Sequence, residues 1–158
     1  MSKILDIMSA LFYIRRMASE EKRAWVMLVV TVAAYGVYVA TVLGRAGAVP
    51  LTDVPYVAPL LWSIGGAFLA SMVLFVAVST TAPAEAGKKD QRDREIHRYG
   101  EYTGQWFLVA GAVAAMVMAM AELPHFWIAN VLYLGFVLSA VLGSTLKIVA
   151  YRRGMPGW

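Results

Sequence analysis

The chain has 158 residues, of which 60% are hydrophobic and 15% are charged, and its mean hydropathy is +0.64. Soluble domains have roughly 45–50% apolar and about 25% charged residues, so this composition excludes an ordinary water-soluble core and predicts an integral membrane protein. The absence of cysteine excludes disulfides, thiolate metal sites and a cysteine nucleophile, and the net charge of +4 comes from residues beside apolar segments, where it predicts membrane orientation.

The first segment of the chain is amphipathic. Residues 1–16 carry apolar side chains at roughly helical spacing, with charged and polar residues between them. A helix of this length is too short to cross a bilayer, which takes ~20 apolar residues. We therefore predict an amphipathic helix over residues 1–18 that either lies at the membrane interface or packs on the protein or on a partner.

Four long apolar segments follow, and each is predicted to span the membrane. Ser19, Glu20 and Glu21 have the capping and acidic residues that start a helix. The first apolar run is longer than that of a secretory signal, so we expect it to be retained. The fold class predicted is an all-α integral membrane four-helix bundle made of two helical hairpins. Within a transmembrane domain of residues 19–158, the predicted spans are 24–43, 57–79, 105–121 and 126–150.

Basic residues are distributed unequally between the two ends of the predicted spans. If the N-terminus is cytosolic, every Lys and Arg except Arg45 lies in a cytosolic segment or at the cytosolic end of a span. Such an excess is the positive-inside pattern of multi-pass proteins. We therefore predict a bacterial inner-membrane protein with both termini in the cytosol.

The longest charged interval occupies residues 88–102, within a predicted cytosolic loop or helix at residues 80–104. A cap at Asp90 followed by a helical pattern predicts a rigid extension of the third span, with apolar and charged residues on opposite sides. This face is either simply solvated or docks a protein partner or a second copy of the chain. Acids and bases are balanced, so nucleic acid is not expected. The candidate partner-binding residues are Asp90, Arg92, Asp93, Arg94, Glu95, His97, Arg98 and Tyr99.

Residues 89–96, Lys-Asp-Gln-Arg-Asp-Arg-Glu-Ile, resemble the K-D-E-R-D-x-x-I motif of an uncharacterised family of small bacterial membrane proteins. Members of that family place the motif before a span in a chain of about four spans, and the family usually has Glu where this chain has Gln91. They are often encoded beside small helix-turn-helix regulators. The resemblance implies a regulatory or sensing role and implies no catalytic residue.

Small residues within and beside the spans predict close helix packing, because helices in lipid associate through surfaces that let their backbones approach. Most of this packing is expected within the chain, and the remainder between protomers. The candidate packing residues are Gly65, Gly66, Gly100, Gly104 and Gly111.

We find no ionisable residue in the middle of a predicted span, which argues against proton-coupled transport. Lys147 lies about one turn from a span end, where its long stem is expected to reach the interface. Glu122 and His125 form one Glu-x-x-His pattern in a turn, whereas a dimetal bundle needs that pattern twice. A solvated turn is the default there, and we expect no catalytic residue, metal or cofactor.

These features predict a non-enzymatic membrane protein that acts by association, as an accessory subunit of a membrane complex or a membrane partner of a cytosolic regulator. One alternative is an enzyme acting at the outer face through Glu122, His125 and Asn130. The other is a small oligomeric transporter or channel. Its polar path would use hydroxyl side chains at Thr31, Thr41, Ser63, Ser71, Ser139, Ser144 and Thr145.

Overall fold

A computed structural model describes residues 19–47, 49–80 and 91–153 of the chain. Within these ranges the chain is almost entirely helical and contains no β-strand. The predicted helix over residues 1–18 lies outside the described residues. The elements are α2 (Ser19–Arg45), η1 (Leu51–Asp53), α3 (Val57–Thr80), α4 (Gln91–Met120) and α5 (His125–Arg153).

The predicted all-α four-helix architecture is confirmed. All four α-helices in the described ranges are long and apolar enough to cross a membrane. Helix α4 begins at Gln91, so the charged residues before the third span form a helix that is continuous with it, as the predicted extension requires. Its charged first turns continue the span without a break, and Ile96 within them is completely buried. This extension therefore packs on the bundle rather than standing alone.

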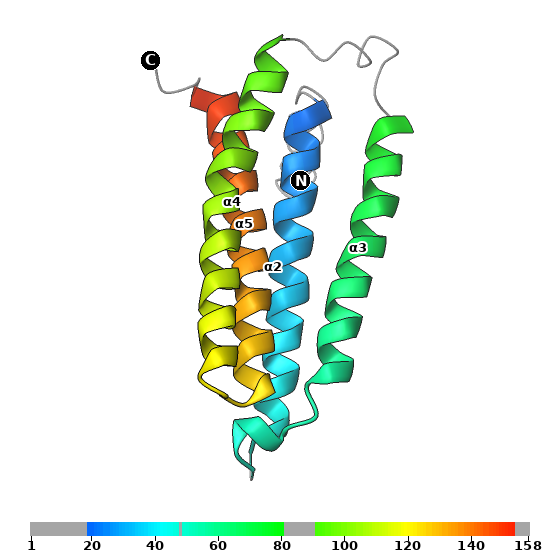
Figure 1. Cartoon of the computed structure of the whole chain (residues 1–158). Coiled ribbons are helices and arrows are strands. Elements are labelled where there is room, and N and C mark those ends of the chain that lie inside the picture. Colours follow the sequence, from blue (N-terminus) through cyan, green and yellow to red (C-terminus); the bar gives the residue numbers. More distant parts are fainter. Residues whose placement is uncertain (1–18, 48, 81–90, 154–158) are drawn as a thin grey trace, which may run out of the picture.

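The helices alternate in direction, with α2 and α4 antiparallel to α3 and α5 (Figure 1). The starts of α2 and α4 and the end of α5 consequently lie together, and we name this the basic end. The opposite end holds η1 and the α4–α5 turn, and we name it the turn end. Close packing joins α4 to α5, α5 to α2, and α2 to α3. The bundle is therefore open between α3 and α4.

The α4–α5 interface is built from glycines. A Cβ added at Gly111 would lie 2.9 Å from the Cα of Gly135, and one at Gly143 would lie 3.1 Å from the carbonyl oxygen of Gly100. Side chains at these positions would hold the helices apart. Their absence lets the two backbones touch, which is a main source of helix association where apolar side chains gain nothing by leaving lipid.

The core near the turn end joins α2, α3 and α5 through hydrogen-bonded polar side chains. Tyr38 donates a hydrogen bond of 2.7 Å to Oδ1 of Asn130, and the hydroxyls of Ser63 and Tyr133 lie 2.6 Å apart. Ser63 also donates to the carbonyl of Ala34 at 3.0 Å. These bonds satisfy groups that would be costly to leave unpaired in lipid. The buried cluster around them contains Tyr38, Val42, Val54, Phe126, Tyr133 and Val137.

Helix α3 is the peripheral helix of the bundle. No residue in its most apolar window is buried, and large side chains such as Trp62 and Phe68 are exposed. A Cβ at Gly65 or Gly66 would meet nothing within 4 Å. In a membrane, this apolar surface of α3 is suited to contact with lipid.

Candidate functional site

A cavity of about 630 Å³ opens among the four helices towards the basic end. Its volume lies within the ~300–1,000 Å³ range of small-molecule sites. Its lining comes from α2 (Arg23, Ala24, Met27), α3 (Phe75), α4 (His97, Gly100, Glu101, Gly104) and α5 (Phe136, Ser139, Ala140, Gly143, Ser144, Lys147, Tyr151).

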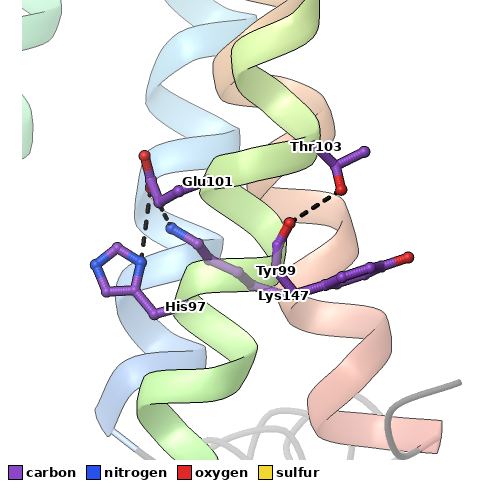
Figure 2. Close-up of polar contacts among 5 residues, drawn as sticks. All are labelled: His97, Tyr99, Glu101, Thr103 and Lys147. Carbon is purple, nitrogen blue, oxygen red and sulfur yellow. Dashed lines mark hydrogen bonds and ion pairs between the residues drawn. The ribbon is translucent and has the colours of Figure 1, made fainter. Parts of the chain in front are cut away.

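The polar wall of the cavity is an ion pair between α4 and α5. Nζ of Lys147 donates a hydrogen bond to Oε1 of Glu101 at 2.6 Å, and Nδ1 of His97 lies 3.7 Å from the same oxygen. Figure 2 shows these three side chains gathered on one side of α4. The Lys147 side chain is 18% exposed and the Glu101 side chain is 65% exposed. The lysine is therefore the enclosed member of the pair, and the carboxylate is the exposed one.

Glycine on α4 brings Lys147 to this position. A Cβ at Gly100 would lie 2.7 Å from Cγ of Lys147, so the lysine stem crosses the helix where a side chain is missing. The ammonium then meets Glu101, the next residue along α4. The expectation that the Lys147 stem reaches the interface stays a prediction, and the structure adds that its ammonium pairs with the exposed Glu101.

A second ion pair joins α2 to α5 at the basic end. Nε of Arg152 donates to Oε1 of Glu21 at 3.2 Å, and Glu21 is buried. The guanidinium of Arg152 also lies 5.6 Å from the ring centroid of Trp25. Such a stack is favourable for arginine, whose flat cation packs on an indole face. The pair fixes the start of α2 against the end of α5.

The predicted partner-binding residues lie on different sides of α4. His97 faces the cavity, whereas the half-buried ring of Tyr99 points to the opposite side of the helix (Figure 2). Arg94, Glu95 and Arg98 are exposed, on the side away from the buried Ile96 and Gly100. Asp90 lies outside the described residues. Arg92 and Asp93 belong to the first turn of α4.

The exposed side of α4 continues from these charges into two aromatic residues. Tyr102 and Trp106 are 65% and 62% exposed, and their rings meet edge to face with centroids 6.4 Å apart. Spacings of three and four residues place them in line with Arg94 and Arg98. We name the surface formed by Arg94, Glu95, Arg98, Tyr102 and Trp106 the outer α4 face.

The five glycines singled out in the sequence separate into two groups. Gly100, Gly104 and Gly111 lie at the α4–α5 interface, where an added Cβ would come within 3.0 Å of α5. Gly65 and Gly66 on α3 face open space within this chain. Their use in contacts between protomers stays a prediction.

The turn between α4 and α5 contains the remaining sequence candidates. Glu122 has a positive φ of 55°, and His125 is exposed at the start of α5. Among the described residues no group of three His, Cys, Asp or Glu side chains is placed to hold a metal ion. Asn130 is hydrogen-bonded to Tyr38 in the core. The suggested enzymatic trio therefore gains no geometric support as a joint site.

The hydroxyl residues suggested for a polar path are used in different ways. Thr41 and Thr145 donate to carbonyls one turn earlier in their own helices, at 2.7 Å each. Ser63 belongs to the turn-end core, and only Ser139 and Ser144 of this set line the basic-end cavity. Transport therefore stays a prediction without a continuous path to support it.

Sequence reasoning missed the tyrosines of the turn-end core. Tyr35, Tyr38 and Tyr133 form a cluster of tilted and edge-to-face rings with centroids 5.3–6.3 Å apart. The sequence did contain a signal for this cluster. Tyrosines of membrane proteins are usually found at the ends of spans, whereas these three lie inside predicted spans. A buried Tyr hydroxyl needs a partner, and that requirement points to a neighbouring polar helix face.

The chain has four apolar helices long enough to span a membrane. Glycine packing joins α4 to α5, and side-chain hydrogen bonds join α3 to α5. These features define a multi-pass α-helical membrane protein. No family model matches the chain, and neither the curated proteins nor the solved structures include a match.

Proposed function

We propose that this protein is non-enzymatic and acts by association in the membrane, with the outer α4 face as its contact surface. The observation that carries the proposal is the two-sided character of α4. On one side Ile96 is buried and Gly100 lies against Lys147 and Gly143 of α5, and the other side presents Arg94, Arg98 and Tyr102. A surface of arginine and aromatic residues on a helix that is fixed in the bundle has the composition of interface hot spots.

The partner that fits this face is a protein at the membrane surface. The outer α4 face has charges of both signs next to exposed aromatic rings. One partner can therefore pair with the arginines and also pack on Tyr102. The resemblance of residues 89–96 to membrane proteins encoded beside small regulators supports a cytosolic regulator or a membrane complex. This is the role of an accessory subunit or membrane-bound partner.

Site-specific photo-crosslinking tests the proposed surface. A photoreactive residue at Arg98 is expected to give a discrete protein adduct in cells, and one at Val73, on the exposed surface of α3, is expected to give none of the same mass. Charge reversal at Arg94 should weaken the Arg98 adduct. Equal adducts from Arg98 and Val73, or an adduct that charge reversal does not change, would contradict the proposal. Co-expressing two tagged forms separates a second copy from a different protein.

We also propose that the basic end faces the cytosol of a bacterial inner membrane. The support is the sequence, in which every Lys and Arg except Arg45 lies before α2, between α3 and α4, or within the basic-end turns of α2, α4 and α5. Because the chain has no cysteine, single cysteines can be introduced without a background. A membrane-impermeant thiol reagent should label Thr52→Cys in intact cells and Arg153→Cys only after lysis. The reverse pattern would invert the orientation.

A further inference from the structure

A groove of about 690 Å³ runs between α2 and α3 from the turn end of the bundle. Its α2 wall extends from Arg45 to Val30, and its α3 wall extends from Ala58 to Ala70. At ~1.5 Å of rise per helical residue, these walls are about 22 Å and about 18 Å long. The α3 wall stops at Ala70, although the helix continues to Thr80. The groove therefore ends part of the way along the span.

The interior of the groove is apolar. Most of its lining residues are alanine, glycine or valine. The hydroxyls of Tyr38 and Ser63 are bonded within the turn-end core, and Thr41 donates to a carbonyl of its own helix at 2.7 Å. These three side chains therefore need no ligand to satisfy their donors. Inside its mouth, the groove suits a hydrocarbon chain rather than a polar solute.

The mouth of the groove is cationic. Arg45 is exposed there, and its Nη1 donates one hydrogen bond, of 3.2 Å, to the carbonyl of Pro55. A guanidinium has five N–H donors, so further donors are available for an anion. Asp53 lies close by in the chain, but it accepts a hydrogen bond from Thr52 and is not part of the described lining. That lining contains one cation and no acid, and its charge matches one anion.

Arg45 is also the exception in the distribution of basic residues. Every other Lys and Arg of the sequence lies before α2, between α3 and α4, or within the basic-end turns of α2, α4 and α5. The positive-inside pattern therefore does not account for Arg45. Trp62 lines the same groove and is 80% exposed, and an indole N–H at a membrane interface can donate to a headgroup oxygen. Together they make the mouth suitable for a phosphate.

The length of the groove favours a lipid chain over a second helix. One leaflet contributes about 15 Å of hydrocarbon, half of the ~30 Å core. A lipid with its headgroup at Arg45 would have its chain ends close to Val30 and Ala70, where the lining ends. A helix from a second copy would instead follow α3 to its end at Thr80.

We propose that this groove binds one anionic phospholipid, with its phosphate oxygens at the guanidinium of Arg45 and one acyl chain along Gly66 and Ala70. A free phosphate ion would use only the mouth and would leave the apolar walls unmatched. The site lies on α2 and α3, whereas the outer α4 face lies on another helix. Its occupancy therefore does not depend on the proposed function, nor on which side of the membrane the turn end faces.

Native mass spectrometry of the purified full-length chain in mild detergent tests the proposal. The protein is titrated with phosphatidylglycerol and with phosphatidylcholine of the same acyl chains. Phosphatidylglycerol is expected to bind more tightly, because the choline headgroup brings a cation that Arg45 repels. Equal affinities would overturn the anionic assignment. Displacement of phosphatidylglycerol by inorganic phosphate at the same concentration would identify a free-anion site and overturn the lipid assignment.

Charge variants test the mouth of the groove. Arg45→Met should weaken phosphatidylglycerol binding about tenfold, the effect of losing one charged hydrogen bond, and should remove the preference over phosphatidylcholine. Arg45→Lys keeps the cation and should keep the preference. Arg153→Met removes an exposed cation outside the groove and should leave both affinities unchanged. If Arg45→Met weakened both lipids equally, the loss would come from the Pro55 contact, and the proposed phosphate site would be wrong.

A matched pair of glycine variants tests the apolar wall without changing charge. A Cβ at Gly66 meets nothing within 4 Å, so Gly66→Leu has room to fold and fills the groove. Gly65→Leu adds the same side chain one residue earlier, also in open space but outside the described lining. Only Gly66→Leu should weaken phosphatidylglycerol binding. Equal affinity in the two variants would show that the chain does not enter the groove. A lipid-free dimer that Gly66→Leu abolishes would assign the groove to a second copy instead.

Discussion

A Cβ at Gly104 would lie 2.7 Å from the carbonyl oxygen of Ser139, so α4 and α5 meet backbone to backbone at this level. The neighbouring atom belongs to a helix backbone and cannot turn aside. We expect Gly104→Ala to lower the free energy of unfolding by about 1–3 kcal/mol, the usual cost of overpacking. The measurement is detergent-denaturant unfolding of the purified protein.

Gly65→Ala is the matched control for this change. Nothing lies within 4 Å of its added Cβ, so only the gain in helix propensity remains. That gain is roughly 0.5–1 kcal/mol for replacing a helical glycine by alanine. Gly104→Ala is therefore expected to lower the free energy of unfolding, and Gly65→Ala is expected to raise it. Equal destabilisation would mean that α3 is covered at Gly65 by another protomer.

Glu122 ends α4 in a left-handed conformation. Its φ is 55°, the amide of Leu123 donates to the carbonyl of Met118, and the amide of Glu122 donates to that of Ala119. This is the Schellman pattern, in which glycine is preferred. Glu122→Gly should stabilise the protein by about 1 kcal/mol, because glycine has no Cβ strain there. Thermal unfolding measures the change.

Glu122→Ala separates backbone strain from loss of the charge. Alanine keeps the Cβ and removes the carboxylate, so it should not reproduce the glycine gain. Equal stabilisation by the two variants would assign the effect to the charge and contradict the backbone argument.

The hydroxyls of Ser63 and Tyr133 should be energetically coupled, since they lie 2.6 Å apart between α3 and α5. Side-chain hydrogen bonds between membrane helices contribute about 0.6 kcal/mol on average. A double-mutant cycle of Ser63→Ala and Tyr133→Phe is expected to give a coupling energy near that value. Thr41 is the control, because its hydroxyl donates to a carbonyl of its own helix. Thr41→Val should therefore show no coupling to Tyr133→Phe.

Replacing Arg152 should lower the free energy of unfolding, because it leaves the buried carboxylate of Glu21 without its guanidinium partner. The carboxylate would lose its guanidinium partner 3.2 Å away while staying largely enclosed. Arg152→Met is expected to destabilise by about 1–2 kcal/mol, because a buried charged group loses a charged hydrogen bond. Arg153→Met, one residue away and exposed, should change stability little.

The combination Arg152→Met with Glu21→Gln checks this reasoning. Neutralising the acid removes the unpaired charge, so the double variant should recover part of the lost stability. A double variant as unstable as the sum of the single changes would show that the two side chains act independently.

Much of the fold was predictable from the sequence, because the signals for membrane helices are local. Apolar length marked four spans, and each falls on a described helix. The helical extension at the start of α4 was also predicted, but the burial of Ile96 and the contact of Gly100 with α5 were not, because a charged turn looks solvated until its neighbours are known. The candidate site was less predictable, because only His97 lines the cavity among the proposed partner-binding residues whose side chains are described.

The sequence by itself determined the class of protein, the four spans and the uneven distribution of basic residues. These follow from composition and spacing along the chain, which do not depend on which helices are neighbours. Tertiary structure alone decided that Lys147 pairs with Glu101, 46 residues away, and that Tyr38 bonds Asn130, 92 residues away. The physical reason is that a helix presents several faces, and packing selects which one meets a partner.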